Sequence, residues 1–185
     1  YTSSIGAYSN TDVFKESDYK LDSLPMDFAG WAKRMAELQV HAYNVQFNLD
    51  NYAIVRPCNV YGPGDNFDPE NAMVIPSLIA RALGGENPLV VWGDGTPIRD
   101  FIHASDVACG MMLALEKGET RPVNLGSGKG YSIRKVAELI KKYTPGKLKI
   151  VWDTSKPSGD KKRLMDITRA RFIGFRPEIS LEDGI

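Results

Sequence analysis

The chain has 185 residues, with 23 basic and 23 acidic side chains, so its formal net charge is zero and neither nucleic acid nor an anionic membrane is an expected partner. No apolar run approaches the roughly 18 residues that span a bilayer, and no secretory signal opens the chain. Because Cys58 and Cys109 form no spaced metal or disulfide pattern, we expect a reduced, cytoplasmic, enzyme-like domain without a metal site.

The first third of the chain predicts a strand, a long helix and a second strand. Tyr1 to Ser4 has the composition of a strand end, and 5–26 that of a loop. From Asp27, a favourable N-cap, apolar residues recur every three or four positions, which predicts an amphipathic helix with one buried stripe. The stripe consists of Phe28, Trp31, Met35, Leu38, Ala42 and Val45. The β-branched run 51–55 predicts a buried parallel strand, so the three elements form a βαβ unit and the fold class is α/β.

The loop 56–67, dense in Pro, Gly and Asn, follows that strand directly. The ligand crevice of an open parallel sheet lies at the carboxyl ends of its strands, so this loop is either a binding site or a plain connector.

Short strands and helices are predicted for the rest of the chain. The predicted strands are 89–92, 123–125 and 149–152. The predicted helices are 72–83, about 106–117 with Ser105 as its cap, one that Ser132 caps, and 167–173. The helix 72–83 has a buried stripe of Val74, Ile75, Leu78, Ile79 and Ala82, and the helix after Ser132 one of Ile133, Val136, Ala137 and Ile140. The segment 153–166 is predicted to be a polar, basic loop.

The two ends suggest a piece of a longer protein. The chain opens on Tyr1 at a strand end, and Leu181 begins what looks like another helix.

Lys33 lies in the first half of the long helix, and position 29 lies one turn before it on the same face. Four residues is the spacing at which a tyrosine and a lysine do proton chemistry, because the ammonium lowers the pKa of the phenol. Position 29 is Ala here, and a lysine alone on such a helix is usually a solvated surface residue.

Five strings of residues, in the right order, resemble the extended short-chain dehydrogenase/reductase family of NAD(P)-dependent nucleotide-sugar epimerases, dehydratases and reductases. The strings are Ser3–Ser4, Gly30–Lys33, Arg56–Pro63, Trp92–Phe101 and Asn124–Gly128. Within the family, the segments 65–69, 74–76 and 153–157 look most like the GDP-L-fucose synthase branch. The resemblance covers almost the whole chain.

The resemblance implies the C-terminal part of a Rossmann-type fold plus a small substrate-binding domain. Residues 1–63 would belong to the NAD(P)-binding domain and 64–185 mainly to the substrate-binding region, with about 89–125 returning to the Rossmann sheet. The glycine-rich turn that receives the cofactor pyrophosphate is not in this sequence, so half of the cofactor site is expected outside it. A homodimer through the long helix is also implied.

The resemblance further implies two groups of site residues. Ser4 would hydrogen-bond the reacting sugar oxygen, Lys33 would bind the nicotinamide ribose, and Pro57 would lie beside the nicotinamide. The residues that would hold the nucleotide sugar are Asn59, Arg81, Arg99 and Arg163. Guanidinium groups pair bidentately with phosphate oxygens, which suits a diphosphate. Arg163, in the basic run 161–163, is equally consistent with a solvated loop.

Three positions depart from the family pattern. The catalytic tyrosine aligns with Ala29, so the acid–base group for hydride transfer at sugar C4 is missing, a loss that typically costs about 10²- to 10⁴-fold in rate. The cysteine and histidine that GDP-L-fucose synthases use for epimerisation correspond to the thiol-free segment 5–7 and to Met73. Ala29 is compatible with an engineered inactive form, with a natural small residue, or with another proton donor such as Tyr8 or His41.

The leading hypothesis is therefore an NAD- or NADP-dependent epimerase or reductase that acts at C4 of a GDP-linked 4-keto-6-deoxy sugar. A UDP- or dTDP-sugar 4-epimerase or 4,6-dehydratase is the alternative, and the dehydratase is disfavoured because Ile5–Gly6 offers no carboxylate pair. From another class, a non-catalytic nucleotide-sugar-binding protein fits Ala29. A protein without any ligand is the remaining alternative.

Overall fold

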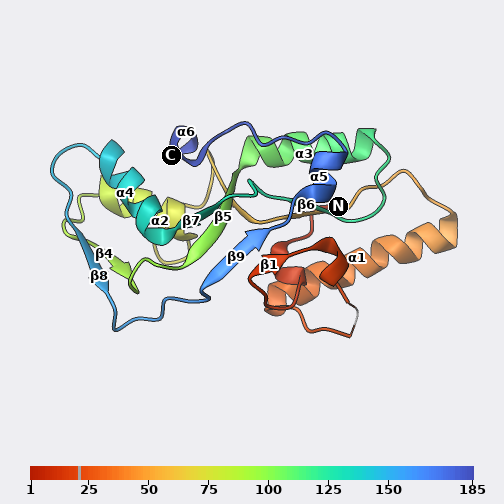
Figure 1. Ribbon diagram of the computed structural model, residues 1–185, viewed down its shortest axis with the longest axis horizontal. Helices are drawn as coiled ribbons and strands as arrows, with labels where there is room; N and C mark the ends of the chain where they lie inside the picture. Colours follow the sequence, from red (N-terminus) through yellow and green to blue (C-terminus); the bar gives the residue numbers. More distant parts are fainter. Residues whose placement is uncertain (21) are drawn as a thin grey trace.

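The computed structural model describes residues 1–20 and 22–185 and shows mixed helices and short strands (Figure 1). Position 21, inside the predicted loop 5–26, lies outside the described residues. The α-helices are α1 (Phe28–Phe47), α2 (Val74–Leu83), α3 (Ala104–Glu116), α4 (Ile133–Tyr143), α5 (Thr168–Phe172) and α6 (Leu181–Gly184). Two short 3₁₀ helices, η1 (Ile5–Ala7) and η2 (Glu16–Asp18), lie in the N-terminal segment. In the described part of the chain, no helix combines the length and the apolar character that crossing a membrane requires.

The strands are mostly parallel, which confirms the α/β class. They are β1 (Val13–Phe14), β2 (Val55–Pro57), β3 (Asn59–Tyr61), β4 (Leu89–Trp92), β5 (Ile98–His103), β6 (Val123–Leu125), β7 (Gly130–Ser132), β8 (Ile150–Asp153) and β9 (Lys162–Met165). β2 pairs with β6, and Thr2 adds an isolated parallel bridge to β2. A second sheet runs β1-β9-β5-β3 with β7 antiparallel to β5, and β4 pairs with β8.

Two hydrophobic clusters form the core. The first includes Phe14, Val55, Leu125 and Met165. The second lies under α2 and α4 and includes Leu78, Leu89, Phe101, Val136 and Ile140. β5 contributes side chains to both clusters, because successive side chains of a strand point to opposite faces of the sheet. Phe101 therefore packs in the second cluster and its neighbour Ile102 in the first.

The periodic patterns of α2 and α4 are confirmed. Ile75, Leu78 and Ala82 of α2 are buried, and Val74 and Ile79 are half-buried against the second cluster. In α4 the buried residues include Val136, Ala137 and Ile140.

The buried apolar stripe predicted for α1 is wrong, since all six of its residues are exposed. Phe28 and Val45 are 94% and 84% exposed, and Trp31, Met35, Leu38 and Ala42 are also open to solvent. The face of α1 that packs inward carries Gly30, Arg34 and Glu37 instead. The periodicity of α1 predicted a helix correctly but gave the wrong inward face.

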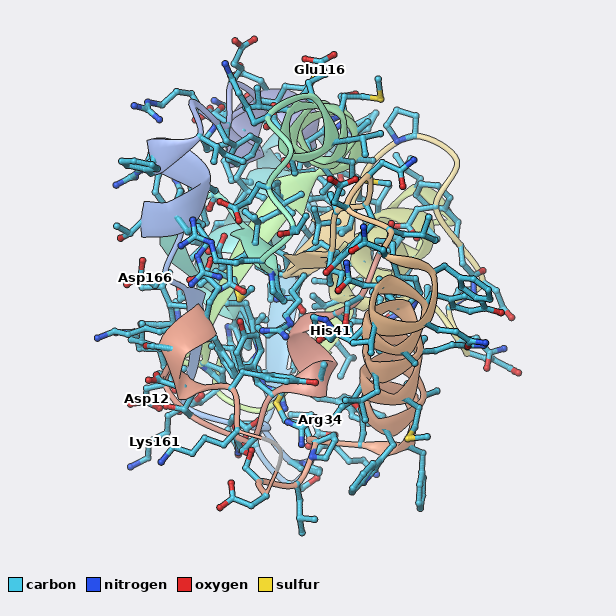
Figure 2. All side chains as sticks on the ribbon, turned by 90° about the vertical axis from the view of Figure 1, so that its right-hand side faces the viewer. Asp12, Arg34, His41, Glu116, Lys161 and Asp166 are labelled. Carbon is cyan, nitrogen blue, oxygen red and sulfur yellow. The ribbon has the colours of Figure 1, made fainter. Side chains whose placement is uncertain are left out.

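Close backbone packing and hydrogen bonds hold that inward face. A Cβ atom added at Gly30 would lie 2.0 Å from the Gly6 carbonyl oxygen, so the helix lies directly on η1. The Arg34 guanidinium donates to the Ala7 carbonyl from Nε at 3.1 Å and from Nη2 at 2.6 Å, and also to the Ser23 carbonyl. Figure 2 shows Arg34 reaching from α1 toward this N-terminal segment.

Several predicted loops contain strands that have distant partners. The strand predicted at 51–55 begins only at Val55, and the loop 56–67 contains the rest of β2 and all of β3. The loop 153–166 contains β9. Both β3 and β9 pair with β5, so their strand character depends on a neighbour far along the chain. Ser105 is not the cap of α3, because His103 takes that role and its Nδ1 accepts the Ser105 N–H at 3.2 Å.

Candidate functional site

A cavity of about 680 Å³ lies beside α2, β4, β5 and the segment that leads into β9. Its lining includes all four residues predicted to hold the nucleotide sugar: Asn59, Arg81, Arg99 and Arg163. Trp92, Phe101 and Leu78 supply apolar surface to the same cavity. The structure therefore brings together, in one cavity, residues that lie on β3, α2, β5 and β9.

Arg99 and Arg163 are direct neighbours in the parallel register of β5 and β9. Burial lowers the pKa of Arg99, and the adjacent Arg163 charge lowers it further, while Asp160 opposes the shift. Two guanidinium groups side by side at a cavity wall repel one another and favour an anion between or beside them.

Asp160 holds both arginines. Nη1 of Arg99 donates to the Asp160 carbonyl at 2.7 Å, and Nε of Arg163 donates to Oδ2 of Asp160 at 2.8 Å. Arg163 is thus a structured wall residue and not a freely solvated one, with its side chain 30% exposed. The sequence analysis missed Asp160, although its spacing of three residues from Arg163 was the available signal.

Arg81 lies at the end of α2 and forms an ion pair with Glu86. Its Nε and Nη2 donate to the two carboxylate oxygens of Glu86 at 2.7 and 2.5 Å, and Nη2 also donates to the Val90 carbonyl at 2.5 Å. The hydrogen bond from Arg81 holds the pKa of Glu86 below its usual value. Arg81 therefore contributes less free positive charge to the cavity than Arg99 does.

Ser4, Ala29 and Lys33 gather at a second place, where η1 meets α1. The Ser4 Oγ accepts the Gly6 N–H at 3.0 Å, and a Cβ atom added at Gly6 would lie 3.5 Å from both the Ser4 Oγ and the Gly30 Cα. Ser4 is therefore close to the first turn of α1, which carries the exposed Ala29. Lys33 is half-buried one turn later, and its Nζ donates to the Thr2 carbonyl at 3.0 Å.

The two proton donors that the sequence suggested in place of a tyrosine at position 29 are not placed for that role. Tyr8 is 2% exposed, and its hydroxyl donates to Asn124 Oδ1 at 2.6 Å and accepts from Arg56 at 2.9 Å. Burial raises the pKa of Tyr8 to about 12, even though the Arg56 charge opposes the shift. His41 lies two turns after Lys33 on α1, edge-on to the ring of Tyr52 at 6.4 Å.

Pro57 lies in the chain between the strand next to Ser4 and the arginine-lined cavity. It ends the buried strand β2, opposite Leu125 of β6, and β3 begins with Asn59 two residues later. The Asn59 side chain donates to the Asp100 carbonyl at 2.7 Å and faces the cavity. One short stretch of backbone therefore runs from β2, which pairs with Thr2 near Ser4, to the arginine-lined cavity.

Lys33 has the donors that a ribose would need. A lysine ammonium carries three N–H donors, and one of them is used on the Thr2 carbonyl. Two donors are left for hydroxyl groups such as those of a ribose, so the residue fits the cofactor role that the family resemblance implies.

Comparisons with known proteins show the family to which the chain is related. The model of the family described as "NAD dependent epimerase/dehydratase family" matches residues 1–126. The chain is 39% identical over 149 residues to GDP-L-fucose synthase 1 of Arabidopsis thaliana, a match that covers 78% of this chain and 46% of that protein. It is 40% identical over 158 residues to the GDP-L-fucose synthase of Escherichia coli K12, covering 78% and 49%.

A solved structure shows the same fold. The GDP-L-fucose synthetase of Naegleria fowleri bound to NADP superposes with a TM-score of 0.87 at 23% identity, over 99% of this chain and 63% of that one. The chain spans about half the length of the curated relatives it matches.

Proposed function

We propose, from the premise that this chain belongs to the NAD dependent epimerase/dehydratase family, that it binds a nucleotide sugar in the arginine-lined cavity, and that the protein acts by hydride transfer at sugar C4. The proposed ligand is a GDP-linked 4-keto-6-deoxy sugar, because the most similar relatives include GDP-L-fucose synthases. The division into a cofactor-binding part at 1–63 and a mainly substrate-binding part at 64–185 belongs to the same proposal.

One observation carries the proposal: the adjacent guanidiniums of Arg99 and Arg163 on the wall of a cavity of about 680 Å³. Arginine pairs bind diphosphates well because each planar fork can donate two parallel hydrogen bonds to phosphate oxygens. Trp92 and Phe101 supply apolar surface for a ring next to the charged groups.

The cofactor proposed is NAD or NADP, which would give or accept the hydride when bound. In this chain Lys33 would hold the ribose and Pro57 would lie beside the nicotinamide. Ser4 would donate to the sugar oxygen, since its Oγ already lies near the first turn of α1.

Ala29 favours a second candidate, a protein that binds the nucleotide sugar and does not turn it over. A methyl side chain cannot exchange a proton, the Tyr8 hydroxyl is engaged with Asn124 in the interior, and the His41 ring packs against Tyr52. Turnover and binding must therefore be measured separately.

The binding test titrates the chain with GDP-, UDP- and dTDP-sugars by calorimetry. We expect the GDP-sugar to bind, and Arg99→Met or Arg163→Met to weaken it about 10- to 100-fold, since each loses a charge-assisted hydrogen bond. Arg121→Met is the matched control, because that exposed arginine forms an ion pair with Glu119 and lies outside the cavity. Equal weakening by all three variants, or no binding of any nucleotide sugar, would refute the cavity assignment.

The turnover test compares the Ala29 form and the Ala29→Tyr variant of the complete gene product, with NAD or NADPH, by NMR of the products. Activity in the tyrosine form alone would identify a disabled C4 redox enzyme. Equal activity in both forms would show that another residue moves the proton. If neither form reacts while a nucleotide sugar binds, the non-catalytic candidate takes the lead.

A homodimer through α1 belongs to the proposal. The exposed residues Phe28, Trp31, Met35, Leu38, Ala42 and Val45 follow alternating steps of three and four, the spacing of a helix–helix seam. Phe28→Asp is expected to shift sedimentation from dimer to monomer, whereas Phe172→Asp, at an equally exposed site on α5, leaves it unchanged. A monomeric wild-type protein would refute this part.

The proposed compartment is the cytoplasm. Both cysteines, Cys58 and Cys109, are free thiols, as is usual in a reducing environment.

A further inference from the structure

Asp100 is a completely buried carboxylate at the centre of β5, directly after Arg99. Its Oδ1 accepts the Ser127 N–H at 2.9 Å and the Ser127 hydroxyl at 2.6 Å. Its Oδ2 accepts the N–H groups of Gly128 at 3.1 Å and Met165 at 3.3 Å. No salt bridge in the described residues includes Asp100. Hydrogen-bond donors, and not an oppositely charged side chain, therefore offset the free-energy cost of burying this carboxylate.

These contacts reach the strand that carries Arg163. The register of β5 and β9 ends at the pair Arg99–Arg163, and Met165 lies two residues further along β9. The Asp100 carboxylate accepts the Met165 N–H and so continues the pairing of the two strands by one side-chain contact. A loss of this contact would leave β9 attached to β5 only up to Arg163, while β1 still pairs with Leu164 and Met165 on the other side.

Asp100 also holds Asn59 and the turn that follows β6. Its backbone carbonyl accepts from the Asn59 side chain at 2.7 Å. The turn is closed tightly on the carboxylate, since a Cβ atom added at Gly126 would lie 2.7 Å from Oδ2. Asp100 thus contacts Asn59, adjoins Arg99 in sequence, and reaches the strand of Arg163 through the Met165 N–H.

We infer that Asp100 is a positioning residue, whose carboxylate and carbonyl keep Asn59, Arg99 and Arg163 in the arrangement that binds the diphosphate of a nucleotide. The inference rests on the proposed function of the cavity. Asp100 itself does not line the cavity, and it acts through the residues that do.

The test measures GDP affinity by calorimetry and thermal stability for Asp100→Asn. An asparagine has one oxygen where the carboxylate has two, so two of the four donors lose their acceptor. We expect GDP to bind about tenfold more weakly at a temperature where the variant is folded, as for the loss of one charge-assisted hydrogen bond to the ligand.

Asp106→Asn is the matched control. Asp106 is also a buried carboxylate that accepts two backbone N–H groups, from Glu178 and Ile179, both at 3.1 Å. It lies on α3, outside the cavity. We expect Asp106→Asn to lower thermal stability while changing GDP affinity less than about twofold, because it leaves the pairing of β5 with β9 intact.

Two further variants separate positioning from general loss of structure. Ser127→Ala removes the 2.6 Å donor to Asp100, together with the hydroxyl's two hydrogen bonds to the Lys129 backbone inside the turn. It should weaken GDP binding by roughly two- to threefold even if Asp100→Asn does not fold. In an Arg163→Met background, Asp100→Asn should have a smaller effect than in the wild type, because the residue through which it acts is gone.

Unchanged GDP affinity in both Asp100→Asn and Ser127→Ala would overturn the inference and leave the proposed cavity function standing. Equal weakening by Asp106→Asn, or full additivity with Arg163→Met, would also overturn it. Failure of the wild-type chain to bind GDP would instead refute the proposed function of the cavity, and the inference with it.

Discussion

Arg56 donates two hydrogen bonds to the carboxylate of Glu37, at 2.9 and 2.6 Å, although each residue is only 1% exposed. The guanidinium also donates to the Tyr8 hydroxyl at 2.9 Å and lies 3.8 Å from the centre of the Tyr19 ring. Glu37 comes from α1 and Arg56 from β2, so a buried ion pair attaches the helix of Lys33 to the strand of Pro57.

Glu37→Gln should destabilise the protein strongly. The substitution leaves the Arg56 charge buried without its partner, which typically costs about 3–5 kcal/mol. Urea unfolding followed by circular dichroism measures the change. Glu182→Gln, which breaks an exposed pair with Lys142, should have a much smaller effect. Similar losses in both variants would contradict the assigned role of the buried pair.

The same pair predicts a pH dependence. Burial raises the pKa of Glu37, but the hydrogen bonds and charge of Arg56 outweigh it and hold the pKa below its ordinary value of 4.5. A depressed pKa in the folded state stabilises the protein above pH 4.5, and this contribution disappears as the pH falls through the folded-state pKa. The stability difference between wild type and Glu37→Gln should therefore shrink on acidification. A difference that stays constant down to about pH 3 would contradict this sign.

Gly30→Ala should be destabilising, although alanine normally strengthens the interior of a helix by about 0.5–1 kcal/mol. The added Cβ would lie 2.0 Å from the Gly6 carbonyl oxygen, which forces α1 away from η1. We expect a loss of about 1–3 kcal/mol in the free energy of unfolding. Gly6→Ala tests the opposite side of the same contact, where a Cβ meets its neighbours at 3.5 Å, and it should be tolerated far better.

The two thiols should react at different rates. Cys58 is buried, and burial followed by the nearby Asp100 charge raises the pKa of its thiol well above the usual value. Cys109 is exposed on α3. Alkylation followed by mass spectrometry should modify one thiol in the native protein and two in denaturant. Cys109→Ser should abolish the native reaction, and a persisting fast reaction would show that the interior around Cys58 is open.

Ser132→Ala should cost about 1 kcal/mol of stability, because the Ser132 Oγ caps α4 by accepting the Lys135 N–H at 3.1 Å. Ser105→Ala should cost little, since Ser105 lies inside α3 and His103 is the cap. Thermal unfolding of the two variants compares the loss of stability at Ser132, which caps a helix, with that at Ser105, which does not. Equal losses would contradict the assigned caps.

Local patterns determined much of this protein. The periodicities of α2 and α4 and the cap at Ser132 could be read from the sequence, because each depends on residues within a few turns. The strings around Asn59, Arg99 and Lys33 indicated the family, which the match over residues 1–126 confirms. The sequence also named Asn59, Arg81, Arg99 and Arg163, which share the cavity wall.

Only the tertiary structure decided which way α1 faces and how the cavity wall is held. The apolar stripe of α1 points outward because Gly30, Arg34 and Glu37 find closer partners in η1 and β2. β9 becomes a strand through its pairing with β1 and β5, and Asp100 gains its role from donors that follow it by at least 27 positions in sequence. Periodicity reports the alternation of polar and apolar side chains along one segment. It does not report which distant segment supplies the partner, and that is fixed only when the chain packs.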